Sequence, residues 1–408
     1  MPALLISGPF LSDLGLSLVA LLFLINSVKN NLKKYYNNYF LKLFLLFCFI
    51  LIISSLLSDN IFPSLKNSLF YFRFGIFSLC FWYLLDKNEK IIKYLFLSTL
   101  ICFSSLIIDG YIQYIFGKNI LGTELYNQYR VSSFFGSELI LGSYLARFFP
   151  LLFGLFIFLD QVKKSKLTLF FITIIFILSE GLIFLSGERL ALFFMNLSTI
   201  FIILMLKKYK AYRFWTYLVS ISLIILLMTI FPNSKERFID QTINDFTRGT
   251  LQNDNDLDDK LYIFSKPHTH MYGTAYNIFL DNKLFGVGPR QFRNECDNYR
   301  IGEYSCETHP HNTYMELLSE GGIFAFLIVF SVFILICFIS IKHLVFKLLK
   351  NKKEIINDFE VCLISSILIS LWPLSPSGSF FNNWMSIVYY FPVGILLWQR
   401  SKYRNSVK

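Results

Sequence analysis

Apolar runs of membrane-spanning length recur along the whole chain and are separated by short polar connections. A helix of about 20 apolar residues crosses the roughly 30 Å hydrocarbon core of a bilayer, and eleven runs approach that length. They lie near residues 4–27, 40–57, 68–86, 92–109, 139–159, 167–185, 189–206, 214–231, 322–341, 360–374 and 383–399. The pattern predicts an all-α integral membrane protein with eleven or twelve transmembrane helices.

The first run decides whether the predicted number of transmembrane helices is eleven or twelve. This run carries Pro9 and Asp13, and it has neither a basic start nor a small-residue cleavage site. We therefore expect a retained segment and not a cleaved signal peptide. A hairpin of two half-helices is the alternative to a single span, and it would leave the downstream helices unchanged.

Composition agrees with a membrane location, because 55% of the 408 residues are hydrophobic and only 16% are charged. Of the 38 Lys and Arg, 22 lie in the C-terminal tail and in alternating connections, near 29–34, 87–93, 163–166, 207–213 and 342–353. The opposite short connections hold only Lys66, Lys118, Arg130 and Arg189. Short cytoplasmic loops are rich in Lys and Arg, so the segment 233–320 is predicted to lie outside the cytoplasm. The net charge of +11 reflects this topology and implies no nucleic-acid partner.

The long connection divides the chain into three parts: N-terminal membrane helices (1–232), a large periplasmic loop (233–320), and C-terminal membrane helices with a cytoplasmic tail (321–408). A connection of this length within a compact fold usually carries function. Its stretch "MYGTAYNIFLDNKLF" has helical spacing at Ala275 and Ile278, and "GVGP" is typical of a turn. We therefore expect the loop to be structured and to hold the active-site residues.

Cysteine positions also single out the long loop. Cys296 and Cys306 lie there, whereas the other five cysteines lie in apolar runs, where they are typical packing residues. In an oxidising periplasm the two loop cysteines can form a disulfide. A crosslink that closes a loop of this length stabilises the folded state by about 3 kcal/mol. We expect the bonded form. Two free thiols are the alternative, because spacing alone does not establish the geometry.

Four of the five histidines form two His-x-His pairs in the same loop. They are His268, His270, His309 and His311. Residues i and i+2 of an extended strand share a face, so the pairs raise the possibility of a zinc site. No Cys or Glu stands at a familiar ligand spacing, and the acidic run "DNDLDD" at 254–259 lacks the glycine and glutamate of an EF-hand. We expect no metal and a solvated acidic loop.

The stretch "CETHPHNTYMELLSEGG" predicts a positioned base. Thr313 and Glu316 have capping-box spacing and would start a helix at about Tyr314, so that His311 lies just before the helix N-terminus. The field there disfavours imidazolium and helps to keep a histidine neutral near pH 7. The glycine pair would end this turn or bend it into the next apolar run. The alternative is a histidine that only satisfies backbone groups at the membrane surface.

Outward-facing arginines predict a phosphate site. Arg189 starts an apolar run after "SGE", and an arginine beside free helix N–H groups suits phosphate oxygens. Arg130 and Arg290 lie in other outward connections, and Arg73 lies inside a run, where an unpaired charge usually faces a cavity. The alternatives are a snorkelling anchor for Arg189 and a carbonyl or acid partner for Arg73. Cations that converge on one membrane face would suit a lipid-linked diphosphate.

These motifs together resemble the O-antigen ligase and O-antigen polymerase superfamily of bacterial inner-membrane glycosyltransferases. The resemblance covers most of the chain and rests on "DGYIQYIFGKNILG", "YRVSSFFGSELILGSYLARFFPL", "SGERLAL", "TAYNIFLDNKLFGVGPRQFRNEC" and "THPHNTYMELLSEGGIFAFL". It implies a multi-pass protein of the bacterial inner membrane with its active site facing the periplasm. It also implies a helical bundle of the C-type glycosyltransferase class and glycan transfer from undecaprenyl diphosphate without a metal or another cofactor.

The resemblance further implies residue roles. Arg189, with Leu192 three residues on, matches the family's phosphate-binding arginine, and His311, with Gly321 ten residues on, matches its essential histidine. A second loop arginine, present in many members before the position of Ala275, has no counterpart in this chain. The residues near that place are Lys266, His268 and His270.

We therefore predict a metal-independent, inverting glycosyltransferase in which His311 removes or orients the acceptor proton and Arg189 neutralises the leaving diphosphate. The expected additional diphosphate-binding residues are Arg290, Arg130, His268, His270 and Arg73. The expected partners are the carrier-linked glycan, membrane lipids and an acceptor. The preferred acceptor is a lipid A core sugar, as in a ligase, and the alternative is a second carrier-linked glycan, as in a polymerase. A transporter of lipid-linked sugars is more remote, because inverted repeats and broken midplane helices are not evident in the sequence.

Overall fold

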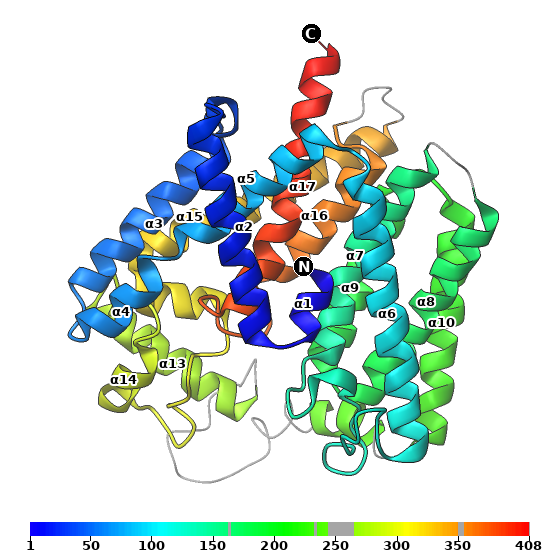
Figure 1. Cartoon of the computed structure of the whole chain (residues 1–408). Coiled ribbons are helices and arrows are strands. Elements are labelled where there is room, and N and C mark those ends of the chain that lie inside the picture. The colour runs from blue at the N-terminus through cyan, green and yellow to red at the C-terminus, as the bar shows by residue number, and fades with distance from the viewer. Residues whose placement is uncertain (162–164, 232–234, 244–264, 350–354, 408) are drawn as a thin grey trace.

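The computed structural model describes residues 1–161, 165–231, 235–243, 265–349 and 355–407 (Figure 1). Regular structure in these ranges is helical, apart from isolated β-bridges in the connection after the fourth apolar run. The predicted all-α membrane class is confirmed, because several of these helices are long and apolar enough to cross a bilayer.

Each of the eleven predicted apolar runs coincides with a helix. These helices are α2 (Pro9–Lys29), α3 (Tyr39–Leu56), α5 (Phe72–Lys87), α6 (Ile91–Phe116), α7 (Leu141–Asp160), α8 (Lys166–Ser186), α9 (Arg189–Met205), α10 (Lys210–Ile230), α15 (Thr313–Leu348), α16 (Asp358–Ser370) and α17 (Asn383–Val407). The shorter elements are α1 (Pro2–Ile6), η1 (Lys33–Tyr35), α4 (Ile61–Ser68), η2 (Ser133–Phe135), η3 (Glu236–Asp240), α13 (Lys266–Asp281), α14 (Phe292–Glu295) and η4 (Cys296–Tyr299).

The number of membrane crossings follows only partly from these helices. In the part of the chain that the structure describes, eight stretches are long and apolar enough to span a membrane by length and composition, with α4 and α5 counted as one stretch. Helix α9 is apolar but has 17 residues, and α16 has 13. The total of eleven or twelve spans therefore stays a prediction.

The first apolar run is bent, as the hairpin alternative expects, but its first arm is short. Helix α1 has five residues, and α2 begins after Gly8, whose φ is 104°. Carbonyl groups of Pro2 and Leu5 accept hydrogen bonds from Tyr144 Oη at 3.1 Å and Trp384 Nε1 at 3.3 Å, which fix α1 against α7 and α17. An arm of about 7.5 Å is too short to cross the bilayer, which favours the lower total of eleven spans.

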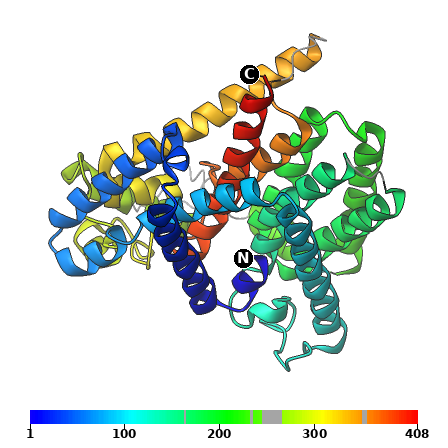
Figure 2. The ribbon, with the colours of Figure 1, turned by 45° about the horizontal axis from the view of Figure 1, so that its top comes forward.

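The two ends of the helical bundle carry different kinds of connection (Figure 1). We call the end with η1 and the C-terminus of α17 the basic end, because the Lys-rich connections after α2, α5 and α9 lie there. We call the opposite end, with α13, α14 and the turn between α8 and α9, the loop end. Figure 2 shows α15 running obliquely across the bundle beside α3 and toward the C-terminal helices.

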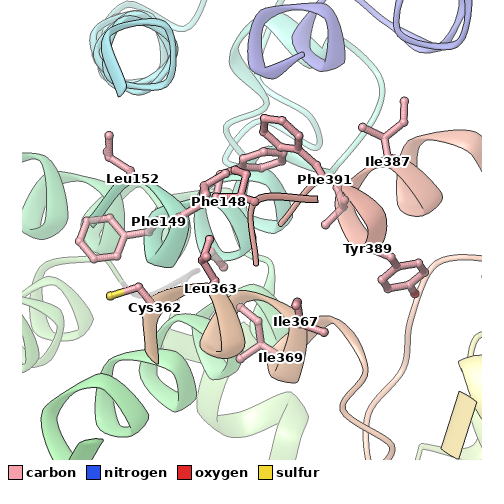
Figure 3. Close-up of a cluster of buried hydrophobic side chains, with 14 of the residues drawn as sticks. Phe148, Phe149, Leu152, Cys362, Leu363, Ile367, Ile369, Ile387, Tyr389 and Phe391 are labelled. Carbon is pink, nitrogen blue, oxygen red and sulfur yellow. The ribbon is translucent and has the colours of Figure 1, made fainter. Parts of the chain in front are cut away.

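Helix α7 lies in the centre of the bundle. Of its most apolar 18-residue window, 89% is buried, against 17% for α10. Phe148, Phe149 and Leu152 of α7 lie in a cluster with Leu363 of α16 and Phe391 of α17 (Figure 3). Lipid tails are as apolar as these side chains, so close packing drives the association more than hydrophobicity does. The packed helix gives a rigid support for the polar side chains near its N-terminus.

Helix α15 bends where it leaves the loop end. Gly322 has φ 68° and ψ −172°, and a Cβ at this position would lie 2.3 Å from the carbonyl oxygen of Leu284. Only glycine avoids both the strain and the clash. The backbone N–H of Ile323 donates to the carbonyl of Lys283 at 2.9 Å, so the chain after α13 packs into the bend. The predicted glycine bend is confirmed.

Candidate active site

A cavity of about 710 Å³ lies at the loop end, where segments far apart in the sequence meet. It is bordered by the start of α7, the turn between α8 and α9, η3, the start of α13, the connection before α15 and the connection after α16. Its polar lining residues are Arg130, Ser143, Arg147, Glu188, Arg189, Arg237, Thr242, Ser265, His268, His311 and Ser375. Four predicted site residues, Arg130, Arg189, His268 and His311, therefore share one cavity.

The turn between α8 and α9 organises one wall of this cavity. Gly187 ends α8 in the left-handed region with φ 67°, which glycine adopts without strain. Arg130 Nε donates to the carbonyl of Ser186 at 2.8 Å, and Arg237 Nε donates to the carbonyl of Gly187 at 2.6 Å. Burial and the neighbouring Arg237 lower the pKa of Arg130 from its ordinary value. Two guanidinium groups thus lie against the same turn.

Glu188 joins this turn to the central helix. Its carboxylate accepts hydrogen bonds from the backbone N–H groups of Gly142 at 2.6 Å and Ser143 at 2.9 Å, at the start of α7. Burial raises the pKa of Glu188 to about 7, although these donors and the nearby Arg130 and Arg147 act in the opposite direction. Four guanidinium groups and this single carboxyl group line the cavity. The net charge of the cavity lining is therefore positive near neutral pH.

Arg189 is the first residue of α9. Its Nη1 donates to Thr242 Oγ1 at 3.0 Å, which ties the helix to the chain after η3. Leu190 and Ala191, in the same first turn, also line the cavity. First-turn N–H groups have no intrahelical partner, and the field at a helix N-terminus favours anions. An arginine at this place fits the oxygens of a phosphate group.

Arg147 of α7 is not among the predicted site residues, yet it lines the same cavity. It is 3% exposed, its guanidinium lies over the ring of Phe194 at 4.9 Å, and its Nη1 donates to Ser143 Oγ. Among the described residues its Nε has no acceptor and no carboxylate lies within 4.0 Å of it. The one sequence signal is a lone arginine in the apolar run "YLARFFPL", and such a charge usually faces a functional cavity.

His311 lies just before α15, as predicted, but the helix is capped differently. Its backbone has φ 52°, and its carbonyl accepts the N–H of Ser377 at 2.8 Å. Asn312 is the N-cap, because its side-chain oxygen accepts the N–H groups of Tyr314 and Met315 at 3.0 and 3.1 Å. The predicted capping box is therefore wrong, although the position of the histidine relative to the helix is confirmed.

Glu316 has a different role from the one that its spacing indicates. Its carboxylate accepts hydrogen bonds from Ser379 Oγ at 2.6 Å and from the N–H of Phe380 at 2.7 Å. These bonds attach the first turn of α15 to the connection 371–382, part of which lines the cavity. The connection 371–382 thus holds the chain at His311 directly, through Ser377, and again in the first turn of α15, through Glu316.

The imidazole of His311 is half-buried among other rings. Its centroid lies 4.0 Å from that of His309 and 6.1 Å from that of His268. Burial lowers the pKa of His311, and Glu307 acts in the opposite direction. Burial and the neighbouring His311 lower the pKa of His309 to about 3. Both imidazoles are therefore neutral near pH 7, and His311 is able to accept a proton.

The other histidine pair lies in a helix, which corrects the extended geometry considered for a zinc site. Helix α13 contains both residues and has Pro267 in its first turn, where a missing N–H costs no hydrogen bond. His268 and His270 therefore point to different sides. His268 lines the cavity, with Nδ1 2.6 Å from Ser265 Oγ. His270 is 3% exposed, packs against Tyr304 and lies outside the lining.

The predicted disulfide is present. Cys296 and Cys306 are bonded, with their Cα atoms 5.4 Å apart, so η4 is attached to the segment that leads to His309. Within the described ranges, the group of three potential metal ligands that lies close enough together consists of these two sulfurs and Asp297. Bonded sulfurs are not thiolate ligands. The acidic run at 254–259 lies outside the described residues.

Besides His270, two more predicted diphosphate ligands, Arg290 and Arg73, lie outside the lining of the cavity. Arg290 Nη2 donates to the carbonyl of Phe381 at 2.9 Å, and its backbone N–H donates to Glu320 at 2.6 Å. Arg73 Nη2 pairs with Asp13 at 2.6 Å. The structure therefore has the alternative arrangement for Arg73, a pair with a neighbouring acid.

Comparison with known proteins agrees with this geometry. Residues 172–330, which include Arg189, α13 and His311, match the protein family described as O-Antigen ligase. A stretch of 108 residues is 28% identical to the teichuronic acid biosynthesis protein TuaE of Bacillus subtilis (strain 168). That match covers 26% of this chain and 22% of the relative. These similarities cover only part of the chain, and they support the resemblance to the O-antigen ligase and polymerase superfamily.

Proposed function

Because the similarities support the O-antigen ligase and polymerase superfamily, we propose that this chain transfers a glycan from undecaprenyl diphosphate to an acceptor hydroxyl. The proposed acceptor is a lipid A core sugar, and the proposed location is the periplasmic face of the bacterial inner membrane. The reaction is an inverting glycosyl transfer without a metal. The family match suggests glycan transfer as the general activity. The identity of the donor and of the acceptor and the side of the membrane are further parts of this proposal.

The observation that carries the proposal is the convergence of a neutral histidine and several arginines in one cavity. His311 and Arg189 are separated by more than a hundred residues, and both line the same space together with Arg130, Arg147 and Arg237. A diphosphate carries at least two negative charges, and arginine offers the fork of N–H donors that matches phosphate oxygens. The cavity therefore combines a proton acceptor with a site for an anionic leaving group.

The reaction begins with the acceptor hydroxyl. Its oxygen attacks the anomeric carbon of the carrier-linked sugar, the new C–O bond forms, and the bond from that carbon to the phosphate oxygen breaks. His311 accepts the hydroxyl proton, since burial keeps the imidazole neutral near pH 7. The left-handed backbone conformation of His311 and the N-cap residue Asn312 hold the imidazole just before the N-terminus of α15. Direct displacement inverts the anomeric configuration.

The arginines act on the other end of the breaking bond. Negative charge grows on the diphosphate as the bond breaks, and in this proposal Arg189, which lines the cavity at the start of α9, stabilises it. Arg147 and the pair Arg130 and Arg237 supply further positive charge around the same space. A buried cation stabilises such charge more strongly than an exposed one, because water screens it less. The released carrier keeps both phosphates.

A second candidate is the joining of two carrier-linked repeat units, as in a polymerase. The similarity to a protein named for teichuronic acid biosynthesis favours it, since that name refers to biosynthesis of a cell-surface glycan and not to ligation. The same catalytic groups serve both reactions, because only the acceptor differs. The two candidates are separated by supplying the purified enzyme with each acceptor in turn.

The test uses purified full-length protein with a polyprenyl-diphosphate-linked glycan and either acceptor. His311→Ala is expected to lower the rate by about 10²- to 10⁴-fold, the usual contribution of a general base. Arg189→Ala is expected to lower the rate and to weaken donor binding, and Arg189→Lys should restore only part of both, because lysine has no bidentate fork. Product formation is followed by mass spectrometry of the glycosylated acceptor.

Arg300→Ala is the matched control, because Arg300 is an exposed loop residue paired with Asp297 outside the cavity. It should keep full activity. All variants are compared for membrane insertion and for the Cys296–Cys306 disulfide, so that misfolding is recognised. Near-normal transfer by a folded His311→Ala protein would show that this histidine is structural. Loss of activity in a chelator, with recovery on adding zinc, would contradict the metal-independent reaction.

A further inference from the structure

A second large space lies inside the membrane part of the molecule, away from the candidate active site. It is an apolar groove of about 380 Å³ between α3 and α15 on one side and α16 and α17 on the other. Its walls include Phe40 of α3, Val332 and Ile336 of α15, and Val393 of α17. None of its lining residues also lines the polar cavity at the loop end.

The depth of the groove corresponds to one leaflet of a bilayer. On α17 it extends from Tyr389 to Arg400, and the eleven helical steps between them rise about 16 Å. The hydrocarbon core of a bilayer is about 30 Å thick. The groove's length along α17 is therefore about half of that thickness, which fits the acyl chains of one leaflet, and its inner end is lined by Leu371 and Phe380 of the connection 371–382.

At the basic end the groove adjoins a polar pocket. This pocket has a volume of about 850 Å³ and shares Phe40, Leu397 and Arg400 with the groove, so the two spaces lie side by side. Its other lining residues include Lys34, Lys42, Asn37, Asn38 and Ser401. Trp82 also lines it, and indole rings are common at the level of lipid headgroups. An apolar groove that ends in a polar, basic pocket matches the shape and polarity of a phospholipid.

The charges in the pocket favour an anionic headgroup. Lys34 and Arg400 are paired with Asp86 at 2.7 Å and Glu360 at 2.6 Å, respectively. Lys42, by contrast, is exposed and has no carboxylate within ion-pair distance in the ranges that the structure describes. Helix α3 begins at this pocket, and its N-terminus adds a further partial positive charge.

We propose that the groove and the pocket together bind one anionic glycerophospholipid of the leaflet at the basic end. Its acyl chains lie between α15 and α17, and its phosphate lies at Lys42 and the start of α3. Phosphatidylglycerol is a lipid of this chemistry. The bound lipid would fill the space between the pair α3 and α15 and the pair α16 and α17. The proposal does not depend on the proposed reaction, because the site and its test involve binding only.

The test measures which lipids stay bound to the full-length protein. The protein is placed in nanodiscs that contain equal amounts of phosphatidylglycerol and phosphatidylethanolamine, released into mild detergent and analysed by native mass spectrometry. Phosphatidylglycerol is expected to be retained in preference to phosphatidylethanolamine. Lys42→Gln should reduce this enrichment about five-fold, the usual effect of one basic residue at an anionic lipid surface. Lys342→Gln, on α15 and outside the pocket, is the matched control and should leave it unchanged.

A second pair of variants tests the groove itself. Val332→Trp places a large ring in the groove and is expected to reduce retention of both lipids. Ile334→Trp lies on the exposed face of the same helix, outside the groove, and should have no effect. Equal retention of the two lipids by the unaltered protein would overturn the proposal. Displacement of phosphatidylglycerol by added undecaprenyl phosphate, with Val332→Trp blocking that binding, would also overturn it, since the occupant would then be a polyprenyl chain.

Discussion

The four guanidinium groups of the cavity are held by their neighbours in different ways. Arg130 and Arg237 donate to backbone carbonyls of the turn between α8 and α9, and Arg189 donates to Thr242. Arg147 is the most buried of the four, and one of its donors has no acceptor in the described chain. A donor buried without an acceptor is costly, and a bound anion would remove that cost. Of the four arginines, we therefore expect Arg147 to contribute most to binding of the carrier-linked glycan.

Arg147 and Arg73 form a matched pair for testing this expectation, because both are arginines inside apolar runs. Arg147→Gln should raise the KM for the carrier-linked donor by about tenfold or more, since a hydrogen bond to a charged group contributes about 1.5–3 kcal/mol. Arg73→Gln should lower thermal stability and leave this KM unchanged, because it leaves Asp13 without its partner. Steady-state kinetics and thermal unfolding in detergent measure the two effects. Equal KM changes in both variants would contradict the assignment.

The pH dependence of transfer should report the ionisation of His311. Burial places the pKa of His311 below its ordinary value of 6.5, so the base stays neutral as the pH falls from 8 to 6.5 and becomes protonated only below that range. The rate should therefore be constant down to about pH 6.5 and should decrease at lower pH. Glu307 acts to raise this pKa, so Glu307→Gln should move the decrease to still lower pH.

The control for this profile is Glu303→Gln, which removes an exposed carboxylate from the same loop but is not among the groups that shift the pKa of His311. Its profile should match that of the unaltered protein. Rates measured from pH 5 to 8 at saturating substrate provide the comparison. A decrease centred above pH 7 would mean that the titrating group is not His311.

At the scale of helices, the sequence is informative wherever the membrane imposes a length. The bilayer requires about 20 apolar residues per crossing, and so α3, α8 and α10 lie within a few residues of their predicted ranges. The start of helix α13 is not evident from the sequence, because two histidines at i and i+2 are compatible with both a helix and a strand. The pattern from Ala275 onward predicts its second half, but only the folded loop shows that it begins at Lys266.

The candidate site was predictable only in part, because its members meet through tertiary contacts. Arg189 and His311 stand beside recognisable motifs, so sequence alone identifies them. Arg147 lies at the apolar end of the stretch "YRVSSFFGSELILGSYLARFFPL", and the resemblance assigns it no role. Glu316 has capping-box spacing, but its partners are more than sixty residues away, at Ser379 and Phe380. No local rule can choose between a bond to the helix's own N-terminus and a bond to a distant connection.

The disulfide belongs to the same scale, because it connects two short elements of the loop. Replacing both Cys296 and Cys306 by serine should lower the stability of this region by about 3 kcal/mol, the entropy that a crosslink over ten residues removes from the unfolded chain. The segment 307–311 should then sample more conformations, and transfer should slow because His311 is less well positioned. Hydrogen exchange of residues 297–311 measures the first effect. Unchanged exchange in the double variant would show that the crosslink does not hold the segment.

At the scale of the whole molecule, the two ends of the bundle have separate roles. The loop end gathers the histidines, the arginines and the disulfide, whereas the basic end carries the Lys-rich connections and the lipid-sized groove. The positive-inside rule assigns the basic end to the cytoplasm. In the proposed orientation the cavity is on the outer side, where an oxidising environment allows the disulfide to persist. Charge distribution and cysteine chemistry both favour this proposal.

This orientation predicts a pattern of cysteine accessibility in intact cells. Lys283→Cys, exposed at the loop end, should react with a membrane-impermeant maleimide, because the segment 233–320 is expected to face the periplasm. Lys90→Cys and Lys342→Cys, exposed toward the basic end, should react only after the membrane is permeabilised. The best background is Cys337→Ser, since Cys337 is the partly exposed member of the five free cysteines and the other four are buried. Labelling of the two basic-end cysteines in intact cells, with Lys283→Cys protected, would place the cavity in the cytoplasm, and a periplasmic reaction with a carrier-linked glycan would then be excluded.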